Sequence, residues 1–470
     1  MEMPNWDEQT DIVVIGSGLA GLAAAIEARE TGASVVVLEK MALTGGNTRI
    51  SDGGLAAPGN FLQKRMGIAD SPELFREDMM KAGMGLNHPE LVTVVAEKAA
   101  AVIDWTREAL GVQYLQRLDR FGGHSAARSL TTRSHSGVDI IKAQEKKLRG
   151  LGVKIRTRCL LTALITDNRG AVRGVEFQPG YRFPKKTDAP KKTLRAVRAV
   201  VLATGGFGRD VEFRRLQNPS LNESIGSTNH RGATSEGLAA ALRIGAAPIH
   251  LSWIQTGPWA CADEAGYGKG SRFASYSVYP TGILVDPATG RRIVNEWADR
   301  RIRSEAIIRT ERACVGIVDA EGARQDSRSL EPCLKNGKVK GFEKLAELAD
   351  AYGMPAGELI RTVEEYNRRI TQGGTDEFGK PLHQDPRPLS EPPFYAIRLW
   401  PKVHYTSGGV GINSRAQVLN LTGRPVPNLF AAGEVCGGIH GASRLGSCAL
   451  IECLVFGRIA GQEAAVSPHT

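Results

Sequence analysis

Short apolar runs alternate with glycine-rich turns along much of this 470-residue chain. Residues 11–15 and 34–38 are apolar runs of strand length, and the alanine-rich segment 22–28 between them predicts a buried helix. A strand, a glycine turn, a helix and a second strand in this order are typical of a parallel α/β unit that binds a dinucleotide.

Three glycines and one glutamate in this unit have the spacing that a dinucleotide requires. Gly16 permits the tight turn, Gly18 lets the backbone approach a pyrophosphate, and Gly21 allows close helix–strand packing. Glu39 follows Gly21 by eighteen residues, where an acidic group would bind the ribose hydroxyls. A glycine-rich turn that binds nothing is the alternative interpretation.

Small residues are also concentrated near the other end of the chain, from 404 to 461. His404 and Arg444 stand among them as side chains that could reach a ligand. Turns at 44–48 and 51–57 could line an isoalloxazine ring, and residues 199–206 form a strand that enters a glycine turn. These segments together predict one flavin site built from both ends of the chain.

Periodic segments between the two ends predict a second region of helices and strands. Apolar positions recur with helical spacing at 342–351 and 354–367, residues 373–376 form a loop, and a strand follows Pro392 and Pro393. The basic, proline-containing segment 185–195 predicts a solvated hairpin or loop.

Composition narrows the class of protein. The apolar content of 42% is that of a globular protein, and no apolar run is long enough to cross a bilayer. The acidic start lacks the pattern of a secretory signal, so we expect a cytoplasmic protein that does not bind membranes.

The net charge of +10 could attract anionic substrates, but no basic arm or RNA-binding motif indicates nucleic acid. The seven cysteines include no Cys-x-x-Cys pair, which argues against zinc or iron–sulfur sites.

At this point the chain resembles the fumarate reductase / succinate dehydrogenase flavoprotein family, especially its soluble single-chain members. The resemblance covers most of the chain. It rests on the fingerprint at 16–21 and on the motifs Gly45-Gly46-Asn47-Thr48, Ala203-Thr204-Gly205-Gly206, Val294-Asn295-Glu296 with Arg300, His404-x-Thr406-x-Gly408-Gly409, Gly433-Glu434 and His440-Gly441-Ala442-Ser443-Arg444-Leu445-Gly446.

The resemblance implies an α/β fold with a Rossmann-like FAD-binding domain formed by both chain ends, 1–250 and 404–470. An α+β capping domain would be inserted at 251–403, with substrate between it and the flavin. Asn47 stands where membrane-complex relatives carry the histidine that bonds covalently to FAD, so non-covalent FAD is expected. The expected FAD contacts are Gly16, Gly18, Ala20, Gly21, Glu39, Lys40, Gly45, Gly46, Asn47, Thr48, Gly53, Gly54, Ala203, Thr204, Gly205, Glu434, Ser447, Ala449 and Leu450.

The resemblance also implies roles for the reacting groups. In the family, hydride passes between flavin N5 and one carbon of a C=C bond, and an arginine exchanges a proton with the other carbon. Arg300 matches that arginine, while His404 and Arg444 match the residues that hold the substrate carboxylate. Gly409 and Tyr279 are further expected substrate contacts. Ser447 is expected near the N-cap of the last helix, whose positive end would stabilise reduced flavin.

Two departures from the family pattern affect the expected substrate. Fumarate reductases carry Gln-x-His-Pro early in the cap, and here Gly257 replaces that histidine. Their Thr-Glu pair and relay arginine are also absent from the corresponding segment 274–278. Asp52, Asp299 or a cap tyrosine could replace the relay. The aromatic residues of this region are either cap core or the wall of a site for a larger or less charged substrate.

The sequence therefore predicts an FAD-dependent oxidoreductase that acts on a C=C or CH–CH bond next to a carboxylate or carbonyl, with fumarate itself disfavoured. The reductase direction is preferred. A desaturase of a cyclic ketone or keto acid, similar to ketosteroid dehydrogenases, and a flavin-binding protein without turnover are the alternatives. The expected partners are a small carboxylate or ketone substrate and an external electron donor or acceptor, such as a carrier protein, a quinone or oxygen.

Overall fold

The computed structural model describes residues 3–185, 189–382 and 387–468 of the chain. The contacts divide the chain into two compact units. Unit 1 contains residues 1–222, 230–254 and 405–470, whereas unit 2 contains residues 223–229 and 255–404. Each unit is described separately below.

Unit 1 is built around a mostly parallel sheet with the strand order β18-β19-β8-β1-β2-β5. The strands β1, β2, β5, β8 and β19 pair in parallel, and β18 is antiparallel to β19. A β6–β7 hairpin joins the sheet through β8. The bounds are β1 Glu8–Ile15, β2 Val35–Leu38, β5 Lys154–Arg156, β6 Cys159–Thr166, β7 Val172–Pro179, β8 Lys192–Leu202, β18 Gln417–Leu419 and β19 Pro425–Ala431.

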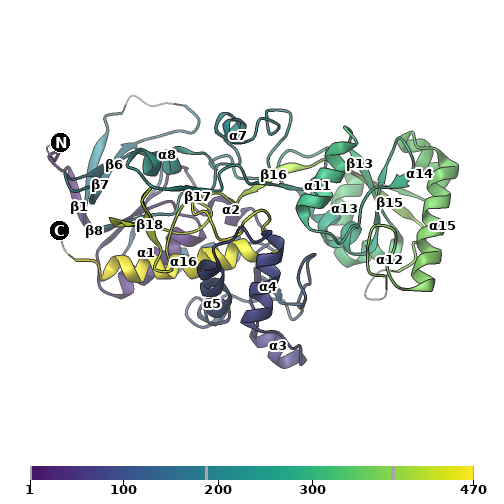
Figure 1. Ribbon diagram of the computed structural model, residues 1–470, viewed down its shortest axis with the longest axis horizontal. Coiled ribbons are helices and arrows are strands. Elements are labelled where there is room, and N and C mark those ends of the chain that lie inside the picture. Colours follow the sequence, from purple (N-terminus) through teal and green to yellow (C-terminus); the bar gives the residue numbers. More distant parts are fainter. Residues whose placement is uncertain (1–2, 186–188, 383–386, 469–470) are drawn as a thin grey trace. The chain divides into compact units, whose positions relative to one another are not determined.

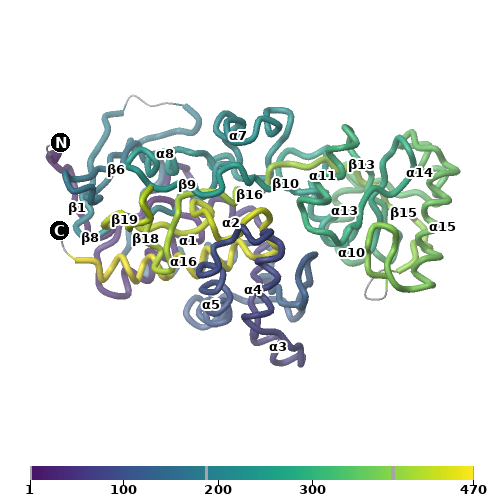
Figure 2. The backbone as a smooth tube through the Cα atoms, viewed as in Figure 1, coloured from purple at the N-terminus to yellow at the C-terminus, as the bar shows by residue number. Residues whose placement is uncertain are grey.

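The first and last long helices of unit 1 pack against each other, although they come from opposite ends of the chain (Figure 1). These helices are α1 (Leu19–Glu30) and α16 (Cys448–Ala465). A Cβ atom on Gly457 would lie 2.6 Å from the Ala20 carbonyl oxygen, and one on Gly461 would lie 2.3 Å from that of Ala24. The close approach of the two backbones therefore requires glycine at both positions. In the tube view, purple N-terminal and yellow C-terminal segments run through this same unit (Figure 2).

The remaining elements of unit 1 connect the strands or cover the sheet. They are α2 Gly46–Arg49, β3 Gly54–Ala56, α3 Phe61–Met66, α4 Pro72–Ala82, α5 Pro89–Glu108, β4 Ser129–Thr131, α6 Val138–Gly150, α7 Val211–Gln217, α8 Glu236–Arg243, β9 Pro248–Ile249 and β17 Gly409–Val410. The chain passes between the units in the short strands β10 (Ile254–Gly257) and β16 (Lys402–Thr406).

Unit 2 contains an antiparallel five-stranded sheet with the order β12-β11-β13-β15-β14. Two apolar clusters use different residues of these strands, as the alternation of side chains along a strand requires. The bounds are α9 Lys269–Phe273, π-helix Ala274–Val278, α10 Tyr279–Thr281, β11 Ile283–Asp286, β12 Arg291–Arg292, α11 Arg300–Arg309, β13 Cys314–Val318, α12 Ala320–Ala323, a 3₁₀ turn Arg324–Asp326, α13 Ser327–Lys335, β14 Val339–Phe342, α14 Leu345–Tyr352, α15 Ala356–Gln372 and β15 Phe394–Leu399.

The predicted fold class is confirmed, because unit 1 is an α/β structure whose parallel sheet combines strands from both halves of the chain. The expected helix at 342–351 begins three residues later, since Val339–Phe342 forms β14. Part of the basic segment 185–195 lies outside the described residues, and its end, from Lys192, belongs to β8. Among the described residues, no helix is long and apolar enough to cross a membrane.

Candidate active site

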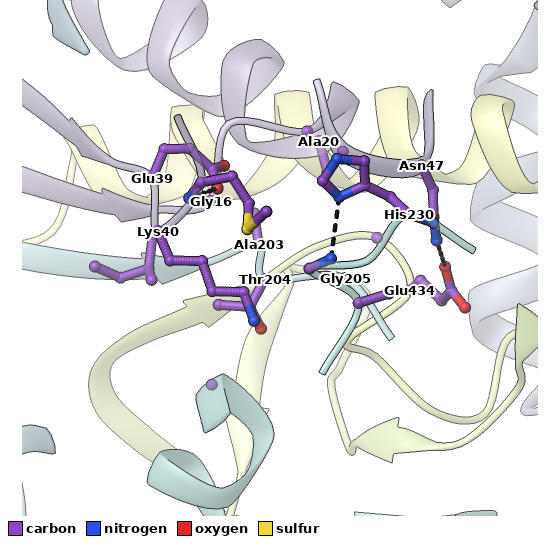
Figure 3. A pocket seen from close by; sticks show the side chains of 18 of the residues that line it. Gly16, Ala20, Glu39, Lys40, Asn47, Ala203, Thr204, Gly205, His230 and Glu434 are labelled. Atoms are coloured by element: carbon purple, nitrogen blue, oxygen red, sulfur yellow. Dashed lines mark hydrogen bonds between the residues drawn. The ribbon is translucent and has the colours of Figure 1, made fainter. Parts of the chain in front are cut away.

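The glycine turn after β1 opens onto a pocket of unit 1 (Figure 3). Gly16 has a φ of +102°, and a Cβ atom there would lie 2.2 Å from the Ala203 carbonyl oxygen. A Cβ atom on Gly21 would lie 2.0 Å from the Gly16 carbonyl oxygen. At Gly18, in contrast, no protein atom lies within 4 Å of the Cβ position. Gly16 and Gly21 thus keep the turn compact, while Gly18 leaves a bare backbone facing the pocket, as a pyrophosphate needs.

Glu39 lines the same pocket and is fixed by the turn itself. Its Oε2 accepts hydrogen bonds from the backbone nitrogen and the hydroxyl of Ser17 at 2.9 and 2.6 Å, and its Oε1 accepts one from the Met41 nitrogen at 2.8 Å. An ionised carboxylate has about four lone-pair sites, so capacity for ribose hydroxyls remains. The side chain is held in place before any ligand binds.

The pocket has about 900 Å³ of empty space when the open solvent at its mouth is included. Many of the residues expected from the sequence line it. These are Gly16, Gly18, Ala20, Glu39, Lys40, Gly46, Asn47, Thr48, Ala203, Thr204, Gly205 and Glu434.

The other expected cofactor contacts lie outside this lining. They are Gly21, Gly45, Gly53, Gly54, Ser447, Ala449 and Leu450. Ser447 occupies the N-cap position of α16, but it has a φ of +60° and its side chain makes no capping hydrogen bond. A Cβ atom on Gly54 would lie 2.7 Å from the Ser447 hydroxyl oxygen. Gly54 and Ser447 bring β3 close to the start of α16. Contact of these seven residues with the cofactor stays a prediction.

Sequence reasoning missed His230, which also lines the pocket. The His230 backbone nitrogen donates to Asn47 Oδ1 at 2.7 Å, and its ring Nδ1 accepts from the Gly232 nitrogen at 3.1 Å. Burial lowers the pKa of the His230 imidazole. The small residues 232–234 were the one signal in the sequence that this segment approaches a ligand.

Glu434 connects the pocket with the strand that follows His404. Its Oε1 accepts a hydrogen bond from the Thr406 nitrogen at 2.9 Å, and its Oε2 accepts one from Asn47 Nδ2 at 3.2 Å. Burial raises the pKa of the Glu434 carboxyl to about 7, although both hydrogen bonds oppose the shift. Near neutral pH this carboxyl can therefore either donate to or accept from a ligand hydroxyl.

Arg444 lies in unit 1 beside a buried polar cluster. Its guanidinium lies over the Tyr405 ring at 4.8 Å, and Nη1 donates to the Leu445 carbonyl oxygen at 2.7 Å. The Tyr405 hydroxyl donates to Glu452 Oε2 at 3.2 Å, and His440 Nε2 lies 3.4 Å from the same oxygen. Burial raises the pKa of Glu452 to about 8 and lowers that of His440. Glu452 and His440 are thus both neutral near pH 7, which leaves Arg444 as the charged member of the group.

His124 contacts the loop that follows Arg444 in unit 1. Its Nε2 lies 2.9 Å from the carbonyl oxygen of Gly446, in the loop after Arg444. Its Nδ1 lies 3.1 Å from Arg128 Nη1, and the Arg128 side chain is buried against Asp70 and Asp78.

His404 and Arg300 meet one aromatic side chain within unit 2. The Arg300 guanidinium lies 4.4 Å from the centre of the Trp259 ring, and the His404 ring lies edge-on to the same indole at 5.0 Å. Arg300 Nη1 lies 3.5 Å from Gln255 Oε1, and His404 Nδ1 lies 2.7 Å from the Thr228 hydroxyl oxygen. The Thr228 contact fixes the orientation of the imidazole, since one edge of the ring is held by the hydroxyl.

Arg300 is the first residue of α11, and its neighbours have structural roles. Asp299 caps the helix by accepting from the Arg301 and Ile302 nitrogens, so this carboxylate is already engaged. Arg303 stacks on Tyr279 at 4.4 Å, and Arg301 and Arg309 pair with Glu305.

The two further substrate contacts expected from the sequence are both buried. Tyr279 belongs to an apolar cluster of unit 2, its hydroxyl donates to the Pro258 carbonyl oxygen at 3.0 Å, and burial raises its pKa. Gly409 pairs with Ile249, and a Cβ atom there would lie 2.0 Å from the Val435 carbonyl oxygen. Their contact with substrate stays a prediction.

Comparison with known proteins identifies the family. A family described as an FAD binding domain matches residues 11–450. The acrylate reductase flavoprotein subunit of Shewanella woodyi is 40% identical over 97% of this chain and 91% of its own length. The chain belongs to the fumarate reductase flavoprotein family. This flavoprotein is also 36% identical to the urocanate reductase of Eggerthella lenta, over 97% of the chain and 74% of the relative. A flavocytochrome c3 fumarate reductase has a similar structure, with a TM-score of 0.79 and 32% identity over 98% of this chain and 79% of that one.

Membership in this family makes the flavoprotein an FAD-dependent oxidoreductase. The pocket of unit 1 fits the cofactor on its own geometry, because the uncovered backbone at Gly18 suits the pyrophosphate and Glu39 suits the ribose. Bound FAD supplies the hydride chemistry.

Proposed function

We propose that this flavoprotein reduces a C=C bond conjugated to a carboxylate or carbonyl, with hydride from reduced FAD and a proton from Arg300. The proposal depends mainly on one observation in unit 2. The side chains of Arg300 and His404 both contact the indole of Trp259. His404 and Arg444 are assigned to the substrate carboxylate, because the forked guanidinium can bind both of its oxygens.

Arg300 is suited to proton transfer by its surroundings rather than by acidity in water. A guanidinium is a poor acid, but the carbanion that forms beside a carboxylate after hydride addition is a far stronger base. The Trp259 face holds the guanidinium by a cation–π contact, so the proton is donated from a defined position. We assign the reductase direction because the similar relatives are named as acrylate, urocanate and fumarate reductases.

Replacing Arg300 tests this assignment. In an anaerobic assay with reduced viologen and a panel of enoates, we expect Arg300→Ala to lower kcat about 10³-fold or more. The FAD content should be unchanged, since the pocket lies in unit 1. Arg309→Ala, on the same helix and with a largely exposed side chain, is the matched control and should retain activity. Full activity of the Arg300 variant would remove this residue from the mechanism.

The desaturase direction is the second candidate. A 3-ketosteroid dehydrogenase from Rhodococcus jostii has a similar structure, with a TM-score of 0.75 and 25% identity over 98% of this chain. Bleaching of the flavin near 450 nm by a saturated ketone or acid without oxygen would favour this direction, whereas reoxidation of reduced enzyme by enoates favours reduction.

We further propose that FAD is bound without a covalent bond. The side chain at the position of the family's flavin-linked histidine is Asn47, whose amide is engaged by Glu434 and the His230 nitrogen. Precipitation with acid should therefore release all yellow colour into the supernatant. Colour that stays with the precipitated protein would contradict this, and His230 would then be the first candidate for the attachment.

Electrons are proposed to come from a separate carrier protein, a quinone or another external donor. The name of the Shewanella woodyi relative, a flavoprotein subunit, supports a partner that holds the other redox centre. The cytoplasmic location expected from the sequence stays a prediction.

A further inference from the structure

Trp259 lies in unit 2, two residues after Gly257, and its indole ring packs close to that glycine. A Cβ atom on Gly257 would lie 3.0 Å from indole Cζ2 and 3.2 Å from Cε2. A side chain at position 257 would crowd the indole and require it to shift by a few tenths of an ångström. The indole itself is almost fully buried, with 5% of its residue surface exposed.

The indole also contacts both residues of this unit that are assigned to the reaction. Arg300 lies over the ring at 4.4 Å, and His404 meets it edge-on at 5.0 Å. The Tyr267 ring is 6.5 Å from His404 and adds a second aromatic side chain to the same group. Because both reacting groups touch Trp259, a ligand that they hold must lie close to the indole.

The electrostatics of this aromatic group favour one kind of ligand. The face of an indole carries partial negative charge, which attracts the Arg300 guanidinium and disfavours a carboxylate. A carboxylate placed in a buried aromatic environment loses its hydration, and it is tolerated only with a partner of opposite charge. An uncharged substituent loses little hydration energy there and is stabilised by contact with the ring.

The indole nitrogen gives the group one neutral polar atom. Trp259 Nε1 is buried and has no hydrogen-bond partner among the residues that the structure describes. Leaving a buried donor unpaired is unfavourable. A neutral donor is a suitable partner for the oxygen of an ester, amide, ketone or hydroxyl. It is a weaker partner for a carboxylate than a cation would be.

We propose that Trp259 determines the specificity of the site and restricts it to enoates with a single carboxylate and an uncharged second substituent. The inference rests on the proposed function. Gly257 supports this arrangement, since it leaves the indole uncrowded in its contact with Arg300.

Fumarate and monomethyl fumarate test the proposal, because the second substituent is an ionised carboxylate in the first and an uncharged methyl ester in the second. With reduced methyl viologen as electron donor, we expect the wild-type kcat/KM to be about 100-fold higher for the monomethyl ester. Trp259→Lys places an ammonium beside the second substituent and should lower this ratio about tenfold or more. Trp259→Phe keeps an uncharged aromatic wall but removes the Nε1 donor, so it should lower the ratio by less than the lysine variant does.

A tryptophan–arginine pair elsewhere supplies the matched control. In unit 1 the Arg458 guanidinium lies 4.8 Å from the Trp105 ring centre, so Trp105→Leu removes a similar contact without touching Arg300 or His404. It should not change the ratio. Trp259→Leu introduces no charge and replaces the lysine variant in the test if that variant does not retain FAD. It should lower the ratio about threefold or more, because the smaller side chain admits water.

The outcomes separate the two proposals. Equal kcat/KM for ester and diacid in the wild type, or an unchanged ratio in both the lysine and the leucine variants, would overturn the role of Trp259 while the reductase activity stands. An FAD-loaded wild-type enzyme that reduces neither compound nor any other enoate would overturn the proposed function and this inference with it.

Discussion

At the scale of single residues, the most unusual group is Glu452, a fully buried carboxyl near the start of α16. Burial raises its pKa to about 8, against the opposing contributions of the Tyr405 hydrogen bond and of Arg444. In the unfolded chain the same carboxyl titrates near its ordinary value of about 4.3. Between these two pH values the folded protein therefore binds one more proton than the unfolded chain.

This difference predicts how stability depends on pH. Since the native state binds the extra proton, the contribution of Glu452 is fully present below about pH 4 and is lost as pH rises through about 8. Between pH 6 and pH 9 we expect the wild type to lose about 2–3 kcal/mol of stability through this carboxyl. Glu452→Gln cannot ionise and should lack this loss.

Chemical unfolding of the FAD-loaded protein at both pH values measures the effect. Glu463→Gln is the control, because Glu463 lies on the same helix but forms a surface pair with Arg415. The same pH dependence in the wild type and in Glu452→Gln would show that this carboxyl is already ionised near neutral pH.

At the scale of elements, glycine has two different roles in the turn between β1 and α1. We expect Gly16→Ala to destabilise the fold by about 3 kcal/mol or more, because its Cβ would collide with the Ala203 carbonyl and its φ of +102° strains any other residue. Gly18→Ala should fold normally, since nothing in the protein lies within 4 Å of the added atom. It should still weaken FAD binding about tenfold or more, because the methyl group occupies the place of the pyrophosphate.

Thermal unfolding without cofactor and flavin titration distinguish these two effects. Gly150→Ala, at the end of α6 and with open space around its Cβ, should change neither quantity appreciably. Unchanged FAD affinity in Gly18→Ala would mean that the pyrophosphate does not approach this turn.

At the scale of the whole molecule, each unit has its own stabilising interactions. Unit 2 has an ionic group at its centre, in which the fully buried Lys380 donates to Glu296 at 3.0 Å and to the Tyr366 hydroxyl at 3.0 Å. Arg292 pairs with the same glutamate at 2.7 Å. Removing one member of a buried ionic group costs about 3–5 kcal/mol, because a charge remains without its partner.

We therefore expect Lys380→Met to loosen unit 2 while unit 1 retains FAD, whose pocket lies within unit 1. Limited proteolysis should cut the variant within 255–404 under conditions where the wild type resists, with the 450 nm absorbance unchanged. The exposed Lys340, replaced by methionine, is the control. Loss of flavin together with cleavage of unit 2 would show that the two units unfold together.

The sequence was most informative where short-range chemistry decides the structure. The strand–turn–helix order at 11–28 and the roles of Gly16 and Gly21 follow from backbone geometry, and the structure has them as expected. Arg300 and His404 were found through motifs, and the structure places both against Trp259. Their catalytic roles stay predictions.

The sequence was less informative where distant segments meet. His230 approaches Asn47 across more than 180 residues, so no local pattern could reveal it as part of the pocket. Ser447 was correctly expected at the start of α16, but its positive φ and its closeness to Gly54 depend on β3, which packs there from the other end of the chain. The indole of Trp259 could not be assigned to core or site, because its direction depends on Arg300 and Gly257 together.

The meeting of α1 and α16 has a consequence for how the cell must make this protein. Glu434 and α16 leave the ribosome more than 400 residues after Gly18, which at about 5–20 residues per second is a delay of roughly 20 s or more. Throughout that interval the pocket lacks one wall, and the apolar face of α1 lacks its partner. We therefore expect flavin to bind only after Glu434 and α16 have been synthesised. A product truncated before these residues should lack the yellow colour of bound flavin.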